Sequence, residues 1–187
     1  MSDRGTFLSH ISLPLAWEAL DHAPSEDELA AAAASNAALL SFLLHGIDLD
    51  AAHRPADEHL AEALAPLRIK IDIVIEMLGR LSYRGVTMPP AREIELGLTR
   101  MSWRSPTALH AEDWLRIRLY FDPVFLEPIV RFGRVASAIA DDGGGFSVQA
   151  ELGEIAPETE EAFARLAFLA QRRQLAQHPA HLAGRTR

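Results

Sequence analysis

The residues that could carry out chemistry are scattered along this chain. It has eight histidines and no cysteine, which excludes a thiolate nucleophile, disulfides and cysteine-ligated zinc or iron–sulfur sites. No histidine falls in an H-E-x-x-H pattern or at a paired helical spacing with carboxylates. Asp141 and Asp142 precede three glycines, a composition typical of a turn and not of an acid–base pair. The sequence therefore predicts no enzyme, no catalytic residue, no metal and no resident cofactor.

Recognition of an anion by arginines is a second chemical option. Five arginines lie close together in the sequence and could form a local basic patch: Arg80, Arg84, Arg92, Arg100 and Arg104. Arg80 and Arg84 end a predicted helix, where arginines are favoured as surface charges. A formal net charge of −8 argues against binding of a nucleic-acid polymer, which needs a basic face.

A long helix is the element around which the rest of the chain is arranged. Apolar residues recur alternately four and three residues apart at seven positions, here called the seam residues: Leu60, Leu64, Leu67, Ile71, Val74, Leu78 and Leu81. This spacing is typical of a coiled coil. A second apolar set lies off the seam, at Ile69, Ile73, Ile75 and Met77. A helix that is apolar on most sides is buried by several neighbours, which favours a bundle of helices from several chains over a long core helix within one domain.

Pro66 lies inside this pattern without changing its phase, which predicts a kink. An earlier helix begins with the capping box of Ser25 and Glu28, and Gly46 is expected to end it. The polar residues 47–56 then form a turn. One stripe of the earlier helix contains Leu29, Ala33, Asn36, Leu40 and Leu43. The sequence leaves open whether Asn36 sets the register between helices or faces solvent.

The remaining segments have the two-residue period of strands. Residues 6–20 contain Pro14, as an edge strand does. Four further strands are predicted over residues 92–98, 114–121, 129–139 and 146–152, and Asp141–Gly145 joins the last two as a hairpin. Together they predict an antiparallel meander or small barrel. A final helix starts near Ala156 and places Phe163, Leu166, Ala167 and Ala170 on one stripe. From Gln174 the chain is polar and predicts a flexible tail, assigned to residues 177–187.

Two short segments resemble the PilZ family of bacterial cyclic di-GMP signalling domains. They are Gly133-Arg134-Val135 in a strand and Gln171-Arg172-Arg173 in the terminal helix. The order of elements is similar to an atypical, tetrameric branch of that family. The resemblance implies an α+β fold: an antiparallel six-stranded β-barrel with a two-helix heptad insertion after the first strand and a C-terminal helix. The barrel domain would cover residues 1–22 and 88–176, and the oligomerisation segment residues 25–86.

The family's nucleotide motifs point to a candidate ligand site. Arg4 takes one position of the R-x-x-x-R motif, and Leu8 stands where its second arginine would fall. In the D/N-x-S-x-x-G motif only Ser102 matches, with Arg100 and Ser105 at the flanking positions. Arg104 could replace some of the lost charge. The candidate ligand residues are therefore Arg4, Arg100, Ser102 and Arg104.

The resemblance implies a non-enzymatic signalling or adaptor protein that regulates motility, pilus function or virulence. It would form a homotetramer through the seam residues and bind an unidentified signalling protein. The alternative is a cyclic di-GMP receptor with a rebuilt site. No apolar run approaches the roughly 20 residues of a membrane span, and the N-terminus lacks a signal-peptide pattern, so a cytoplasmic location is expected.

Overall fold

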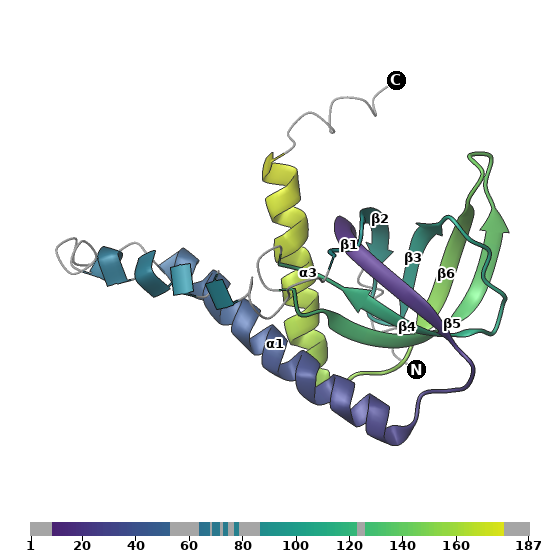
Figure 1. The fold of residues 1–187 in the computed structure, drawn as a ribbon, viewed down its shortest axis with the longest axis horizontal. Coiled ribbons are helices and arrows are strands. Elements are labelled where there is room, and N and C mark those ends of the chain that lie inside the picture. The colour runs from purple at the N-terminus through teal and green to yellow at the C-terminus, as the bar shows by residue number, and fades with distance from the viewer. Residues whose placement is uncertain are drawn as a thin grey trace, which may run out of the picture.

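Six antiparallel strands close into a barrel in the computed structural model, which describes residues 9–52, 64–67, 69–71, 73–74, 77–78, 87–122 and 126–177. The strand order around the barrel is β1-β2-β3-β6-β5-β4 (Figure 1). The strands are β1 (Ser9–Leu20), β2 (Ala91–Leu96), β3 (Arg100–Ser105), β4 (Trp114–Leu119), β5 (Ile129–Ala140) and β6 (Phe146–Leu152). The predicted six-stranded barrel is confirmed.

Alternating apolar side chains fill the barrel. Leu115, Ile117 and Leu119 of β4 are fully buried, whereas Arg116 and Arg118 lie on the outer face. Ile94 and Leu96 of β2 are buried in the same way. This alternation agrees with the two-residue period of the two segments, because that period fixes which side chains of a strand share a face.

The strand β3 was missed by the two-residue pattern. Only two large apolar side chains, Met101 and Trp103, point inward from it, and both are buried. The third inward position is Ser105, whose hydroxyl donates to the carbonyl of Thr107 at 2.6 Å. With three polar residues on the opposite face, β3 has too few apolar residues to differ from a loop in sequence.

Pro14 does not lie in a simple edge strand, contrary to expectation. Residues Ser9–Pro14 of β1 pair with β2, whereas Leu15–Leu20 pair with β4. Pro14 therefore lies where β1 changes partner. Proline has no N–H to donate to a ladder, and this change of partner accommodates it within a closed barrel.

The first helix, α1 (Glu26–Ala52), begins as predicted but is longer. The capping box is formed, since Ser25 N–H donates to Glu28 at 3.0 Å and Glu28 N–H donates to the Ser25 hydroxyl at 3.3 Å. Gly46 does not end the helix, which continues through six residues that were expected to form a turn, Ile47–Ala52. A glycine inside a helix costs only about 1 kcal/mol relative to alanine, and the neighbouring leucines and isoleucine favour helix.

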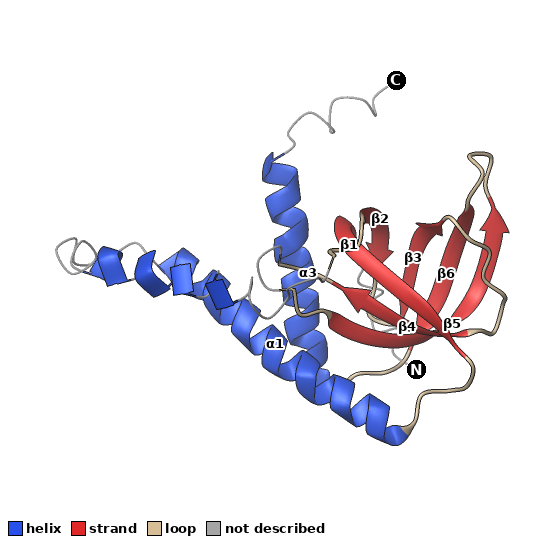
Figure 2. Ribbon diagram, viewed as in Figure 1, coloured by secondary structure: helices blue, strands red, loops and turns tan. Residues whose placement is uncertain are grey.

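The C-terminal helix, α3 (Pro157–Gln177), packs on the barrel through the predicted stripe. Phe163, Leu166 and Ala167 are buried. The predicted start of the tail at Gln174 is wrong, because this side chain exchanges two hydrogen bonds with the Ser12 backbone at 2.9 and 2.6 Å. The tail assigned to residues 177–187 lies outside the described residues, apart from Gln177. Figure 2 shows both helices on one side of the barrel, with the β5–β6 hairpin projecting from the other.

One stretch among the described residues, Glu26–His45 of α1, is long and apolar enough to cross a membrane by length and composition. The expectation that no run approaches that length is therefore wrong. Leu39 and Leu40 of this stretch are buried in the hydrophobic core that the barrel forms, and a core helix meets the same criterion.

Candidate functional site

The candidate ligand residues Arg100, Ser102 and Arg104 lie in a row on the outer face of β3. Burial alternates along this strand, and all three side chains are exposed or half-buried. Alternate residues of a strand are about 6.6 Å apart, so the row spans roughly twice that distance. The fourth candidate, Arg4, lies outside the described residues, as do Arg80 and Arg84.

The Arg104 side chain forms an ion pair with the β5–β6 hairpin. Its Nε and Nη2 atoms donate to the two carboxylate oxygens of Asp141 at 2.6 and 2.7 Å. These hydrogen bonds stabilise the carboxylate and lower the pKa of Asp141 to about 2, and they raise the pKa of Arg104. Asp141 also accepts from the backbone N–H groups of Gly143 and Gly145 at 2.8 and 3.2 Å. The Asp141 carboxylate therefore binds both the Arg104 side chain and the backbone of the hairpin turn.

The other two candidates also lie beside carboxylates. Ser102 donates to Glu95 of β2 at 2.8 Å, and Arg100 lies opposite Glu151 of β6 in the strand register. The structure thus brings Arg100, Ser102 and Arg104 onto one face, but with an acid next to each. An incoming phosphate would have to compete with these carboxylates for the same donors.

Arg92 does not join this row of side chains. Its guanidinium lies 5.0 Å from the ring centroid of Trp17 and donates to the Arg104 carbonyl at 3.2 Å. Trp17 in turn lies 5.5 Å from Trp103. The described arginines of the predicted basic patch therefore do not form one patch. Arg92 stacks on a tryptophan, and Arg104 pairs with an acid.

Asn36 attaches α1 to the barrel, a role that the sequence did not suggest. The side chain is 4% exposed. Its amide nitrogen donates to the Val130 carbonyl at 2.7 Å, and its oxygen accepts from the Val130 N–H at 2.9 Å. Strand β6 pairs with β5 only from Gly133 onward. Asn36 thus takes the place of a missing strand at the start of β5, and it neither faces solvent nor sets a register between helices.

A network of charges makes a second attachment between α1 and the barrel. Arg116 of β4 donates to Glu18 of β1 at 2.8 Å and to Glu28 of α1 at 2.6 Å, and Arg118 donates to Glu18 at 3.0 Å. The pKa of Glu28 is lowered, mainly by its hydrogen bonds with Ser25 and also by Arg116. These partners are 98, 88 and 100 residues apart in sequence, so no local pattern indicates them.

Arg131 is buried at the end of the barrel that α3 covers, with 3% of its surface exposed. Its Nη2 donates to the carbonyls of Leu98 and Gly153 at 3.0 and 2.7 Å, and its guanidinium lies 5.4 Å from the Phe163 ring centroid. Burial lowers the pKa of Arg131 to about 10. In the sequence, this burial is indicated by the inward position that Arg131 takes in the alternation of its strand. In the structure, Arg131 lies opposite Ile117 of β4.

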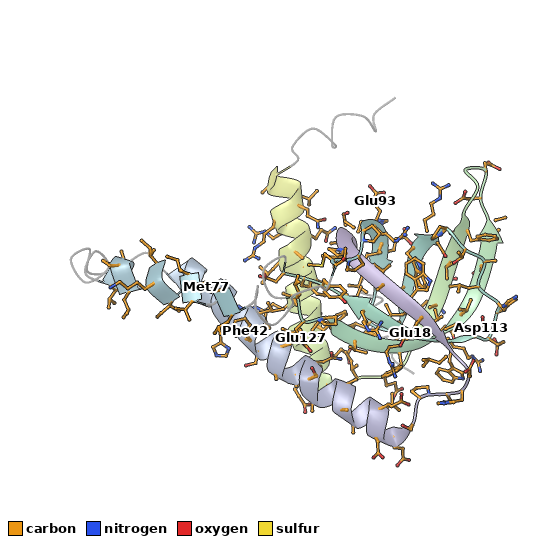
Figure 3. The ribbon with its side chains drawn as sticks, viewed as in Figure 1. Glu18, Phe42, Met77, Glu93, Asp113 and Glu127 are labelled. Carbon is orange, nitrogen blue, oxygen red and sulfur yellow. The ribbon has the colours of Figure 1, made fainter. Side chains whose placement is uncertain are left out.

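The described seam residues are helical and uncovered. Leu64, Leu67, Ile71, Val74 and Leu78 are each 50–57% exposed. Ile69, Ile73 and Met77 of the second apolar set are 50–59% exposed. Figure 3 places Met77 away from the barrel, on the helical pieces that extend from it. Leu60, Leu81 and Ile75 lie outside the described residues. No group of three or more His, Asp or Glu that could hold a metal occurs within the described part of the chain.

Comparison with known proteins shows that a solved structure has a similar architecture. No protein-family model and no curated protein matches the chain. Among solved structures, it is similar to a pathogenic protein from Xanthomonas campestris, described as a new tetrameric PilZ domain that self-assembles through a helical bundle. The TM-score is 0.70 at 20% sequence identity, over 92% of each chain. The chain therefore has a PilZ-like fold: a six-stranded antiparallel barrel with a helical insertion after the first strand and a C-terminal helix.

Proposed function

We propose that this chain is a non-enzymatic, cytoplasmic adaptor of bacterial signalling that assembles into a homotetramer through the seam residues. One observation carries the proposal. Eight large apolar side chains, from both the seam and the second apolar set, are at least half exposed over residues 64–78 of the single chain. Contiguous exposed apolar surface of this kind marks an interaction site, whereas the barrel has its own closed core.

The second apolar set indicates how many neighbours the helix has. Ile69, Ile73 and Met77 follow one another at four-residue intervals and lie off the seam. A two-stranded coiled coil buries only a narrow seam, whereas a wider apolar arc requires contact with two or more helices. The wide arc supports a bundle of more than two helices.

The energy available is adequate for stable assembly. Full burial of one large aliphatic side chain contributes about 1.5–3 kcal/mol. The five described seam residues are about half exposed, so burying the remainder contributes about 4–8 kcal/mol per chain before entropic costs. The relative from Xanthomonas campestris is described as a tetramer built through a helical bundle, which supports the same arrangement here.

The adaptor role follows from the PilZ-like fold and from the state of the candidate ligand residues. PilZ domains serve in cyclic di-GMP signalling, which links the chain to regulation of motility, pilus function or virulence and to a signalling protein as partner. Because Arg104 pairs with Asp141 and Ser102 with Glu95, we expect no saturable binding of cyclic di-GMP at micromolar concentration. Calorimetric titration measures this directly. Saturable binding that Arg100→Ala abolishes would instead support the receptor with a rebuilt site.

Light scattering after size-exclusion chromatography tests the assembly. The parent should elute with a mass of four chains of 20.6 kDa. The double variant Ile71→Asp with Leu78→Asp places charges in the seam, where burial without a partner is costly, and it should have a lower mass. Lys70→Asp is the control, because Lys70 is an exposed, charged residue on the same helix and belongs to neither apolar set. A double variant with the parent's mass, or a monomeric parent, would contradict the proposal.

A further inference from the structure

The outward side of α3 has an apolar and basic stripe that the described part of the single chain leaves exposed. Its members are Arg165, Phe168, Arg172 and Leu175, which follow one another three and four residues apart. Phe168 and Leu175 are 48% and 50% exposed, and the Arg172 guanidinium lies 6.0 Å from the Phe168 ring centroid. Residues at this spacing share one face of a helix, and this face lies opposite the buried Phe163.

The charge of this end of the chain has one sign. No acidic residue follows Glu161 in the sequence, whereas five arginines do: Arg165, Arg172, Arg173, Arg185 and Arg187. The whole chain has a formal net charge of −8, so α3 presents a basic surface on an acidic protein. A helix face that only meets solvent is typically lined by charges of both signs. A partner that fits the stripe therefore combines apolar side chains with acidic ones.

The second apolar set of the long helix has this composition. Ile69, Ile73 and Met77 are four residues apart and 50–59% exposed. In the sequence, Asp72 and Glu76 each follow an isoleucine of this set by three residues, a spacing that puts two residues on one side of a helix. The set thus offers apolar side chains flanked by acids, whereas α3 offers apolar side chains flanked by arginines.

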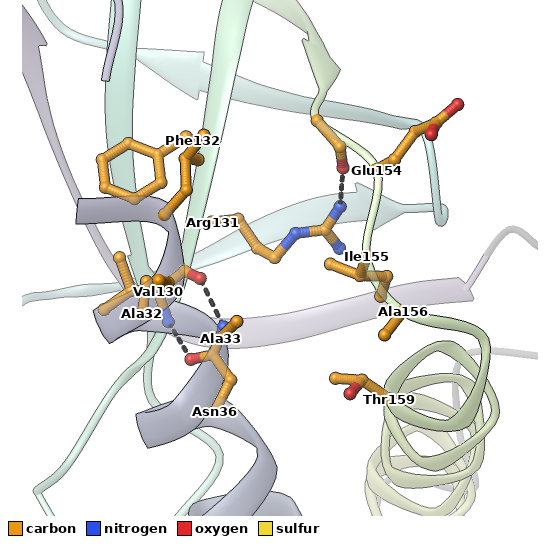
Figure 4. Close-up of a pocket in the computed structure, with 13 residues that line it drawn as sticks. Ala32, Ala33, Asn36, Val130, Arg131, Phe132, Glu154, Ile155, Ala156 and Thr159 are labelled. Carbon is orange, nitrogen blue, oxygen red and sulfur yellow. Dashed lines mark hydrogen bonds between the residues drawn. The ribbon is translucent and has the colours of Figure 1, made fainter. Parts of the chain in front are cut away.

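A second copy of the chain is needed to bring these two surfaces together. Both are exposed in the single chain, so they do not cover each other within it. The first helix does not cover the stripe either, since Asn36 holds the inward side of α1 against Val130 of β5 (Figure 4). Figure 2 shows α3 on the side of the barrel from which α1 extends. A neighbouring copy that packs along the long helix therefore approaches α3.

We propose that the outward stripe of α3 binds the second apolar set of a second copy, so that Phe168 and Leu175 pack against the partner subunit's Ile69 and Ile73. The contact rests on the assembly proposed above, and it deepens that assembly by adding an interface outside the seam. The wide apolar arc of the long helix requires more than one neighbour, and α3 of another copy is one of them. The barrel of one copy is then held by the helix of the next.

Cysteine cross-linking tests the contact in the full chain, which has no cysteine of its own. Chains with Phe168→Cys are co-expressed with chains that have Ile73→Cys, so that a disulfide between the two variants joins different chains. After oxidation with copper phenanthroline, mass spectrometry should detect this mixed disulfide. Arg173→Cys is the control, because Arg173 is exposed on α3 but lies off the stripe, and its yield should be at least about tenfold lower.

Dilution followed by light scattering gives a second readout. The double variant Phe168→Ser with Leu175→Ser loses the apolar contact and should raise the protein concentration of half dissociation about tenfold, whereas Arg173→Ser should leave it unchanged. A parent with the mass of four chains that gives no mixed disulfide, or an unchanged dissociation of the double variant, would overturn this contact alone. A monomeric parent would overturn the assembly and this contact together.

Discussion

Replacement of Asn36 by alanine tests how α1 is attached to the barrel. The side chain is buried and makes two hydrogen bonds with Val130, at 2.7 and 2.9 Å. Alanine removes both partners and leaves the Val130 N–H and C=O groups unpaired at the start of β5. Strand β6 cannot replace them, since its pairing with β5 begins only at Gly133.

The expected cost can be estimated from these contacts. A hydrogen bond contributes about 1 kcal/mol net, and an unpaired buried backbone group costs about 1–3 kcal/mol. Alanine recovers about 0.5 kcal/mol through its higher helix propensity, and water that enters the opened site recovers more. We therefore expect the free energy of unfolding to fall by about 2 kcal/mol, which corresponds to a decrease in Tm of about 4–8 °C for a chain of this size.

Thermal unfolding followed by circular dichroism provides the measurement. Parent and variants must be compared at equal protein concentration, because self-association stabilises the folded state. Ser35→Ala, at an exposed position next to Asn36, is the control and should leave Tm unchanged or slightly higher. If Asn36 were instead a register-setting residue between helices, Asn36→Leu would raise stability, since a buried asparagine at a seam costs stability. A stable Asn36→Ala or a stabilised Asn36→Leu would refute the strand-like role.

Two further predictions concern the barrel. The Asp141 pKa lies at about 2, below its ordinary 3.8, so its pairing with Arg104 favours folding above about pH 4 and is lost as the pH falls through about 2. Asp141→Asn should therefore lower Tm at about pH 6 and have little effect at about pH 2; equal losses at both pH values would contradict this. At Gly133, an added Cβ would lie 2.6 Å from the Glu151 carbonyl oxygen and 3.1 Å from a Leu152 methyl. Gly133→Ala should destabilise the chain by about 1–3 kcal/mol, measured by urea denaturation. Ala138→Gly on the same strand serves as a comparison. An unchanged urea midpoint for Gly133→Ala would show that β6 moves away to make room for the methyl group.

The contact at Gly133 explains part of the family resemblance physically. Gly133 opens the Gly133-Arg134-Val135 segment, and the Glu151 backbone of β6 approaches it closely. Val135, two residues on, is fully buried on the inward face. The segment is therefore recognisable in sequence because a glycine at a close approach and an apolar inward residue are both required by the barrel.

Local chemistry determined which parts of the fold could be predicted. The capping box of Ser25 and Glu28 and the hairpin at Asp141–Gly145 each depend on residues a few positions apart, and both are present. The inward faces of β2 and β4 follow from alternation alone. Where the local preference was weak, prediction failed: β3 has only two large inward side chains, and Gly46 alone does not stop a helix with apolar neighbours.

The sequence by itself determined the type of most elements, the seam spacing and the absence of cysteine chemistry, because these are properties of composition and of short-range periodicity. Only the tertiary structure decided what the polar side chains do. Arg104 pairs with Asp141, 37 residues away, and Asn36 binds Val130, 94 residues away. Arg131 became a buried cation with an unpaired nitrogen only when β5, the 153–156 segment and α3 came together. Such contacts depend on barrel closure, which joins residues that no local sequence pattern relates.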